Sequence, residues 1–335
     1  MGNFWRGTNV FVTGATGMIG AFLVSDLLSK GSNVVALVKD SEPGSELYRS
    51  GNINHISVVN GCLEDFTALE NAINIKDIEI VFHLGAQTIV GAAHRFPLHT
   101  FEANIRGTYN LLDACRVHSD SVKGTVIASS DKAYGEQEEL PYTEEAPLKG
   151  RHPYEVSKSC ADMLAQSYNH TYGLRIGIAR CGNVYGGNDL NFSRIVPGTI
   201  RSLMHGEPPE IRSDGTYIRD YIYVKDVARA YMQLAESLGD DNVNGEAFNF
   251  GTQRPIEVLE LVAAIQKLMN LEEFKPVITS TARGEIENQY LDSGKAHQML
   301  GWRPRYSLEE GLKETIAWYE EYFRCTIRRT DNEQD

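Results

Sequence analysis

The stretch Val10-Phe11-Val12-Thr13-Gly14-Ala15-Thr16-Gly17-Met18-Ile19-Gly20 decides the fold of this chain. Its apolar first part predicts a buried strand, which leads into three glycines and then into a helical pattern over residues 21–28. A second strand predicted at residues 33–38 completes a βαβ unit. Glycines at this spacing, with a strand before them and a helix after them, indicate a loop that binds the pyrophosphate of a dinucleotide.

The three glycines have separate predicted tasks. Gly14 allows the tight turn, Gly17 lets the backbone approach the pyrophosphate, and Gly20 permits close packing of the helix on the strand. The residues of this loop that we expect to contact the cofactor are Gly14, Thr16, Gly17, Met18 and Ile19.

The end of the second strand leaves the choice between NAD and NADP open. Val38 ends the strand, and Lys39 and Asp40 follow it. Asp40 would accept hydrogen bonds from the adenosine ribose of NAD, whereas Lys39 would pair with the 2′-phosphate of NADP. Both could equally be solvated loop charges.

A later segment, Gly61-Cys62-Leu63-Glu64-Asp65, follows a strand predicted at residues 56–59. We expect it to pass near the adenine and to bring Leu63 to the cofactor. The alternative for Cys62 is ordinary core packing.

Strand-like and helical patterns alternate along the first half of the chain. Apolar runs recur near Val10, Val34, Ile56, Ile80, Val126 and Ile176, with helical patterns such as residues 63–74 and 100–117 between them. This alternation predicts an α/β fold with a doubly wound parallel sheet of the Rossmann type.

The pattern changes after Asn183, where a glycine-rich loop, a helix at 195–205 and a short strand at 210–212 predict a smaller α/β substrate-binding portion. We expect the chain to return to the first domain at residues 221–236 and 247–251. The predicted domains are residues 1–182 with 221–253 for the dinucleotide, residues 183–220 with 254–325 for the substrate, and a polar, frayed tail from about Cys325, over residues 326–335.

Composition excludes several classes of protein. The chain has 335 residues, is 42% hydrophobic and carries a formal net charge of −13, which disfavours binding to nucleic-acid polymers or anionic membranes. Its five cysteines show no paired metal-ligand spacing, so we predict no metal site and a reducing compartment. No apolar run is long enough to span a bilayer and the N-terminus lacks the apolar segment of a signal peptide, so we expect a cytoplasmic protein.

Two further motifs indicate chemistry. Residues 129–135 read SSDKAYG and residues 154–158 read YEVSK. Tyr154 and Lys158 are one helical turn apart, and an ammonium near a phenol favours the phenolate. A hydroxyl, a phenol and an ammonium suit the deprotonation of a sugar alcohol beside a nicotinamide. The Asp131-Lys132 pair indicates a step beyond simple oxidation, or else an ion pair at the surface.

Together these segments resemble the extended short-chain dehydrogenase/reductases, and within them the nucleotide-sugar 4,6-dehydratases and epimerases. The resemblance covers nearly the whole chain and includes HLGAQ (83–87), NIRGT (104–108), RCGNVYG (180–186) and IRDYIYV (218–224). FWRG (4–7), SSDKAYG and HPYEVSKSCA (152–161) are most similar to the CDP-glucose 4,6-dehydratases. The phosphate loop and GTYIRDYIYVKDV (215–227) differ from that branch, so the nucleobase and the hexose stay open.

The resemblance implies a redox cycle on a nucleotide-diphosphate hexose. Tyr154, as the phenolate, would accept the proton of the 4-hydroxyl while hydride leaves carbon 4 for the nicotinamide. Lys158 would lower the pKa of the phenol, and Ser130 would hydrogen-bond the same oxygen. Water would then be eliminated across carbons 5 and 6, and hydride would return to carbon 6, so a tightly bound NAD is recycled.

For the elimination, the resemblance implies Asp131 as the acid and Lys132 as the base. Near neutrality both groups begin in the wrong protonation state. A closed, desolvated pocket could favour the neutral pair, and the two would titrate as one coupled system. Their individual roles therefore stay open.

The resemblance also implies further contacts. Arg219 and Arg283 would bind the substrate diphosphate. Asn183 would bind the first phosphate or the sugar, and Gln87 would line the sugar pocket, although either could instead satisfy local backbone groups. A homodimer is implied through the helices that hold Asn104 and Tyr154. The remaining expected cofactor contacts are Leu84, Ala86, Asn104, Tyr154 and Lys158.

Two other functions stay open. A nucleotide-sugar 4-epimerase would need Ser130, Tyr154 and Lys158 but no elimination acid. A noncatalytic dinucleotide-binding protein could keep the fold, since fold does not fix function. Such a protein should have lost part of the Ser-Tyr-Lys set, and this chain has all of it.

Overall fold

The computed structural model describes residues 4–281 and 285–332. Its largest element is a seven-stranded sheet with the order β11-β6-β5-β4-β1-β2-β3, in which every pair is parallel. The strand order reverses between β1 and β4, as in Rossmann folds. The predicted doubly wound parallel sheet is confirmed. The strands are β1 (Asn9–Thr13), β2 (Asn33–Val38), β3 (Ser57–Asn60), β4 (Ile80–His83), β5 (Gly124–Ala128), β6 (Ile176–Cys181) and β11 (Ala247–Phe250).

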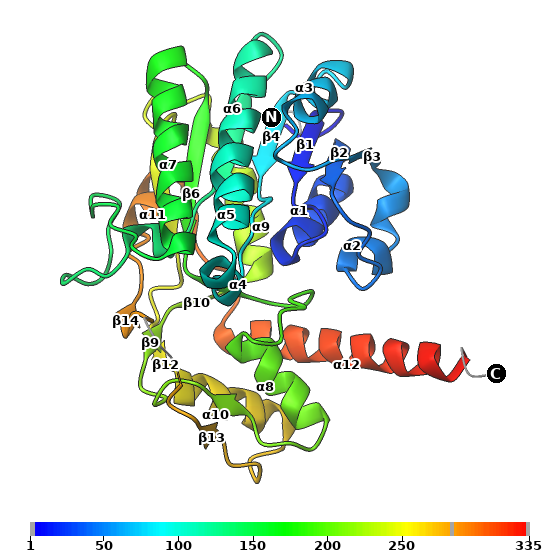
Figure 1. Cartoon of the computed structure of the whole chain (residues 1–335), viewed down its shortest axis with the longest axis vertical. Coiled ribbons are helices and arrows are strands. Elements are labelled where there is room, and N and C mark those ends of the chain that lie inside the picture. The colour runs from blue at the N-terminus through cyan, green and yellow to red at the C-terminus, as the bar shows by residue number, and fades with distance from the viewer. Residues whose placement is uncertain (1–3, 282–284, 333–335) are drawn as a thin grey trace.

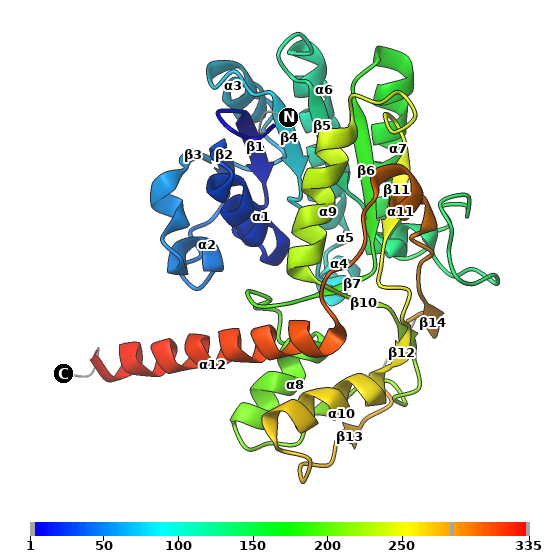
Figure 2. The same ribbon diagram turned by 180° about the vertical axis from the view of Figure 1, so that it is seen from behind.

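Helices cover both faces of this sheet. Figure 1 shows α3 (Phe66–Ile75), α6 (Gly107–Val117) and α7 (Pro153–Tyr172) on the near face. Figure 2 shows α1 (Met18–Ser29), α9 (Val224–Ser237) and α11 (Gly294–Leu300) on the opposite face. Because both faces are covered, the strands are apolar on both sides and read as continuous hydrophobic runs.

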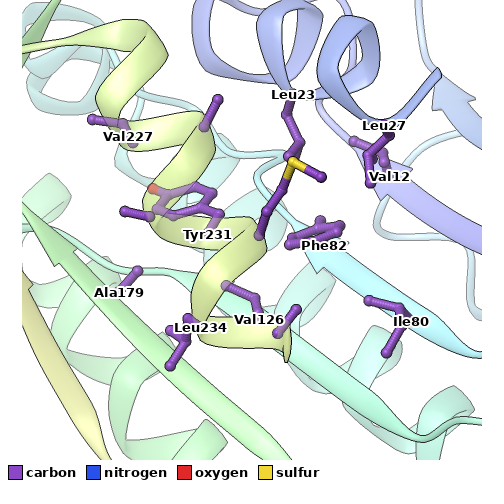
Figure 3. Close-up of a cluster of buried hydrophobic side chains, with 14 of the residues drawn as sticks. Val12, Leu23, Leu27, Ile80, Phe82, Val126, Ala179, Val227, Tyr231 and Leu234 are labelled. Carbon is purple, nitrogen blue, oxygen red and sulfur yellow. The ribbon is translucent and has the colours of Figure 1, made fainter. Parts of the chain in front are cut away.

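The core on the α1 and α9 side is formed by side chains that alternate along the strands. Val10 and Val12 of β1 belong to this core, whereas Phe11 packs in the core on the other face, as the two-residue period of a strand requires. Figure 3 shows Leu23 and Leu27 of α1 and Tyr231 and Leu234 of α9 close to side chains of the central strands.

A smaller part of the chain, which contains α8 and α10, lies below the sheet in Figure 1, and α12 projects from it to the side. Tyr185, Ile200, Leu261 and Tyr319 contribute to its own hydrophobic core. Its elements are β7 (Asn183–Tyr185), α8 (Ile195–Met204), β8 (Glu210–Ile211), β9 (Ile218–Arg219), β10 (Tyr221–Tyr223), β12 (Ile256–Glu257), α10 (Val258–Met269), β13 (Val277–Ile278), β14 (Asn288–Gln289) and α12 (Leu308–Asn332).

Short helices complete the chain. They are α2 (Glu46–Arg49), η1 (Asn52–His55), α4 (Val90–Arg95), α5 (Pro97–Phe101), η2 (Glu102–Arg106) and η3 (Asp131–Tyr134). No helix in the described part of the chain is long and apolar enough to cross a membrane.

Three predicted elements differ in the structure. The helix predicted at residues 100–117 is divided, because η2 is a π-helical turn between α5 and α6. The segment at 221–223 was assigned to the dinucleotide domain, but β10 pairs with β7 outside the large sheet. A frayed tail is predicted from about Cys325, whereas α12 continues to Asn332. No glycine or proline interrupts residues 312–332, so nothing local stops this helix. The division into domains otherwise stays a prediction.

Candidate active site

The loop after β1 has the geometry that its glycines predict. Gly14 has a φ of +73°, and a Cβ there would lie 2.7 Å from the backbone nitrogen of Gly85. A Cβ on Gly20 would collide with the carbonyl oxygen of Gly14. The 12-residue helix α1 begins at Met18 directly after this turn, so its first-turn amides face the loop. This cradle fits a dinucleotide pyrophosphate.

The other predicted cofactor residues lie around the carboxyl ends of the same strands. Lys39 and Asp40 are exposed after β2, so the choice between NAD and NADP stays a prediction. Leu63 packs under Gly85, and Leu84 is partly buried at the end of β4. Ala86, Asn104 and Lys158 line a cavity of about 10 Å³, which is about the room that a single water needs.

Asn104 is buried and its side chain contacts protein groups. Its Oδ1 accepts from the amide of Gln87 at 2.7 Å, and its Nδ2 donates to Gln87 O at 3.0 Å and to Ser157 Oγ at 2.9 Å. Ser157 Oγ in turn donates to the carbonyl of Tyr154. Asn104 therefore connects the β4 loop to the start of α7.

Ser130, Tyr154 and Lys158 meet where β5 ends and α7 begins. Burial raises the pKa of Tyr154 to about 12, while Arg194 and a hydrogen bond with Ser130 act in the opposite direction. The Lys158 ammonium donates to the carbonyl of Ala128 at 2.8 Å, and burial lowers its pKa to about 8.

The predicted lowering of the Tyr154 pKa by Lys158 stays a prediction, and the net direction of the shift is upward. Burial outweighs the nearby positive charge, so the pKa of the phenol rises. The cation that opposes this rise is Arg194, because the Lys158 ammonium is directed at a backbone carbonyl.

Asp131 and Lys132 lie directly beside Ser130, on η3. Asp131 is 3% exposed, its Oδ1 accepts from Ser130 Oγ at 3.0 Å, and its Oδ2 has no hydrogen-bond partner among the described residues. Burial lowers the pKa of Lys132, and the Arg219 charge adds to this, while Asp131, Glu155 and Glu285 oppose it. A surface ion pair, the alternative left open by the sequence, does not describe this arrangement.

Gln289 of β14 is hydrogen-bonded to both residues of this pair. Its Oε1 accepts from the Lys132 ammonium, and its Nε2 donates to the Asp131 carbonyl at 3.0 Å. Gln289 is fully buried. Sequence reasoning missed it, because 157 residues separate it from Lys132.

Two of these residues, Lys132 and Tyr154, line a cleft of about 860 Å³ between the sheet and the smaller part. Asn183 lines it as well. The volume of this cleft is within the size range of ligand-binding clefts. Five arginines also line this cleft, namely Arg95, Arg194, Arg201, Arg212 and Arg219. Their guanidinium groups suit a phosphorylated ligand.

The four predicted substrate residues have different positions. Asn183 lines the cleft, and its Nδ2 is buried with no partner among the described residues. Arg219 lines it too, but its terminal nitrogens donate to the carbonyls of residues 218, 286 and 287. Gln87 satisfies a local backbone group, since its Oε1 accepts from the Ile89 amide. Arg283 lies outside the described residues.

His83 is a further residue that the sequence did not single out. It is buried at the end of β4, and burial lowers its pKa to about 3, so the ring is neutral. The Thr108 hydroxyl donates to Asn104 O at 2.6 Å and can therefore only accept from His83 Nε2 at 2.9 Å. Nδ1 then accepts from the Thr13 hydroxyl, so His83 ties β1 to the helix that holds Asn104.

Comparison with known proteins identifies the family of this chain. Residues 11–315 match the family described as GDP-mannose 4,6 dehydratase. The CDP-glucose 4,6-dehydratase of Salmonella typhimurium is 30% identical over 96% of this chain and 93% of its own length.

Solved structures agree as well. The UDP-glucose 4-epimerase of Thermotoga maritima, solved with UDP-glucose, superposes with a TM-score of 0.85 at 31% identity, covering 96% of this chain and 100% of its own. MoeE5, solved with UDP-glucose and NAD, has a TM-score of 0.83 at 30% identity, covering 94% and 99%. The predicted resemblance is confirmed: this chain, with its Rossmann sheet, belongs to the GDP-mannose 4,6-dehydratase family of extended short-chain dehydrogenase/reductases, which groups nucleotide-sugar dehydratases with epimerases.

Proposed function

We propose that this protein is a nucleotide-sugar 4,6-dehydratase, which converts an NDP-hexose to an NDP-4-keto-6-deoxyhexose. The observation that carries the proposal is the position of Asp131 and Lys132, a buried carboxyl and an amine beside Ser130 at the wall of the Tyr154 cleft. Oxidation at carbon 4 needs neither group. Water elimination needs an acid and a base at this position.

Tyr154 would remove the proton of the 4-hydroxyl, with Ser130 hydrogen-bonded to the same oxygen. NAD held by the glycine cradle would supply the hydride acceptor for oxidation at carbon 4 and the hydride donor for reduction at carbon 6. The glycine cradle and the NAD bound by MoeE5 support this cofactor. Tight binding of NAD, its recycling and a cytoplasmic location remain predictions from the sequence.

The carbon 4 ketone makes the proton on carbon 5 acidic. Lys132, whose pKa burial lowers, is suited to accept that proton. Asp131 would give its proton to the departing 6-hydroxyl, so that water leaves and the double bond forms between carbons 5 and 6. The Oδ2 of Asp131, which has no hydrogen-bond partner among the described residues, would be the acceptor or donor that this step requires. Lys132 would return its proton to carbon 5 as hydride reaches carbon 6.

The cleft arginines support a phosphorylated substrate. Arg194 and Asn183, whose Nδ2 has no hydrogen-bond partner among the described residues, would bind the sugar or its first phosphate. The roles predicted for Arg219 and Arg283 at the diphosphate stay proposals. The relatives include enzymes named for CDP-glucose and for UDP-glucose, so the nucleobase of the substrate has to be measured.

Mass spectrometry of the purified protein with CDP-, GDP-, dTDP- and UDP-glucose, without added cofactor, tests the proposal. We expect loss of one water from one substrate. In Asp131→Asn and Lys132→Met, elimination should fall about 100-fold or more, while hydride transfer still appears as reduced-nicotinamide absorbance. An isomer of unchanged mass, at equal rates in wild type and both variants, would instead identify a 4-epimerase.

We also propose that the protein is a homodimer that buries the outer surfaces of α5, α6 and α7. Tyr154 lies on α7, and Asn104 lies on η2, the turn between α5 and α6. Large apolar side chains are exposed on all three, namely Phe96 and Leu98 at α5, Tyr109 and Val117 on α6, and Met163 and Tyr172 on α7. Exposed apolar patches of this kind mark contact surfaces.

A further inference from the structure

Asn188 lies in a loop that the catalytic proposal does not use. The loop, residues 186–190, follows β7, and Asn188 in it is 3% exposed with a φ of +65°. Its left-handed conformation is one that asparagine adopts more readily than most residues. The fold therefore places this amide inside the protein at a defined point.

The two ends of the Asn188 amide are bonded to the phosphate loop and to the first residue of α2. Nδ2 donates to the carbonyls of Thr16 at 3.3 Å and Gly17 at 3.1 Å. Oδ1 accepts from the backbone amide of Glu46 at 2.7 Å. The first contact is with the phosphate loop, and the second is with the start of α2, directly after the segment that follows β2. A single side chain thus joins the two loops.

Aromatic side chains of α12 support the 186–190 loop from outside. Trp318 lies against Gly187, where a Cβ would collide with its ring, and its Nε1 donates to Glu46 Oε2 at 2.6 Å. The Tyr319 hydroxyl donates to the carbonyl of Asp189 at 2.7 Å. The loop is therefore fixed both to α2 and to the last helix.

The same loop reaches the substrate cleft. The Asp189 carboxylate pairs with Arg194 at 3.1 Å, and Arg194 is the cation that acts on Tyr154. A continuous set of contacts therefore runs from the cleft through residues 188–189 to the phosphate loop.

We infer that Asn188 is a positioning residue for the cofactor: it holds the phosphate loop and the start of α2 together. A bound dinucleotide then dissociates only after the hydrogen bonds of this amide break. The inference rests on the proposed dinucleotide cofactor. Asn188 acts through backbone groups and not by touching the reacting atoms. Without its amide, the Thr16 and Gly17 carbonyls lose a donor and the Glu46 amide loses its acceptor.

Two variants separate the side chain from its backbone. Asn188→Gly removes the amide and tolerates the left-handed φ. Asn188→Asp keeps the acceptor for Glu46 but cannot donate to the two carbonyls. The matched control is Asn270→Gly, because Asn270 is an exposed asparagine with a φ of +56° at the end of α10, outside the cleft.

The measurement is the dissociation rate of radiolabelled NAD⁺, and of NADP⁺ in parallel, from each full-length protein chased with unlabelled nucleotide. The nucleotide retained after purification is quantified by chromatography. We expect dissociation about 10- to 100-fold faster in both Asn188 variants and unchanged in Asn270→Gly. Apo melting temperatures, measured alongside, report any purely structural effect.

A fall in apo melting temperature with dissociation within twofold of wild type would show that Asn188 only stabilises the fold, and would overturn the inference. Wild type that binds neither nucleotide would overturn the proposed function as well. Wild type that binds nucleotide but leaves every sugar unchanged would count against the dehydratase alone, and the rates would still decide the role of Asn188.

Discussion

At the residue scale, the candidate chemistry depends on how the side-chain amide of Gln289 contacts Lys132 and Asp131. Gln289 accepts from Lys132 and donates to the carbonyl of Asp131. Because the amide carries a donor and an acceptor in fixed geometry, it fixes the direction of the amine relative to the neighbouring peptide. Its role would be to position Lys132 for elimination and not for oxidation.

Replacing Gln289 by Leu should therefore affect the two half-reactions differently. We expect water loss to slow about 10- to 100-fold, since both partners lose a buried hydrogen bond, while oxidation at carbon 4 changes much less. Time-resolved mass spectrometry and reduced-nicotinamide absorbance separate these steps. Asn288→Leu is the control, because Asn288 is the exposed neighbour on β14. An equal loss of both steps in Gln289→Leu would contradict a positioning role.

Lys158 gives a prediction for stability against pH. Burial lowers its pKa from 10.5 to about 8, so between these values the unfolded chain binds more protons than the folded protein. Wild-type stability should therefore gain a contribution from Lys158 as pH rises through this window, with the full burial penalty present below pH 8. Lys158→Met lacks this contribution.

The melting temperature of Lys158→Met relative to wild type should accordingly fall between pH 8 and 10.5. Calorimetry across this range measures it, with the exposed Lys76→Met as the control for removing a surface lysine. A constant difference between Lys158→Met and wild type would show that Lys158 titrates alike in the folded and unfolded states.

At the element scale, the βαβ unit at the N-terminus depends on the close approach of α1 to the β1 loop. Gly20 faces the carbonyl of Gly14 with no room for a Cβ, so the helix axis and the loop are held at a fixed separation. Any side chain at this position must push α1 away from the sheet.

Gly20→Ala should therefore lower stability by about 1–3 kcal/mol and weaken dinucleotide binding. Chemical unfolding and nucleotide titration give the two effects. Gly239→Ala is the matched control, because a Cβ on Gly239 would meet nothing within 4 Å. Equal behaviour of the two variants would mean that the loop and the helix adjust freely.

Local patterns explain which elements could be predicted. The strand-glycine-helix order around Gly14 and the YEVSK spacing are short-range signals, and both lie where the sequence predicts them. The π-helical turn η2 was missed because its residues keep a helical pattern on either side. Two-residue strands such as β9 and β14 were missed because their pairing is set by distant partners.

At the scale of the whole molecule, side chains from distant segments complete the site. Arg194, Gln289 and Asn188 each contact groups that are far away in sequence, and no periodicity marks them. Arg219 was predicted at the diphosphate because of its residue type, but the carbonyls of residues 286 and 287 lie within its reach. Such competition is visible in the folded chain alone.

The exposed side chains of α5, α6 and α7 give a prediction for assembly. Leu98 and Met163 are 68% and 61% exposed, and changing both to Glu should convert the dimer to a monomer, because buried carboxylates are strongly disfavoured. Sedimentation velocity measures this. Ile75→Glu, at an equally exposed site on α3, is the control and should leave the dimer intact. A wild type that sediments as a monomer would refute the proposed dimer.

The contact between Trp318 and Glu46 also has a consequence for the newly made chain. These residues are 272 positions apart, so at usual rates of synthesis roughly 14 to 54 s pass between their appearance. The phosphate loop and α2 therefore exist well before the helix that braces them. The contact between Trp318 and Glu46 can therefore form only after the last helix has been made.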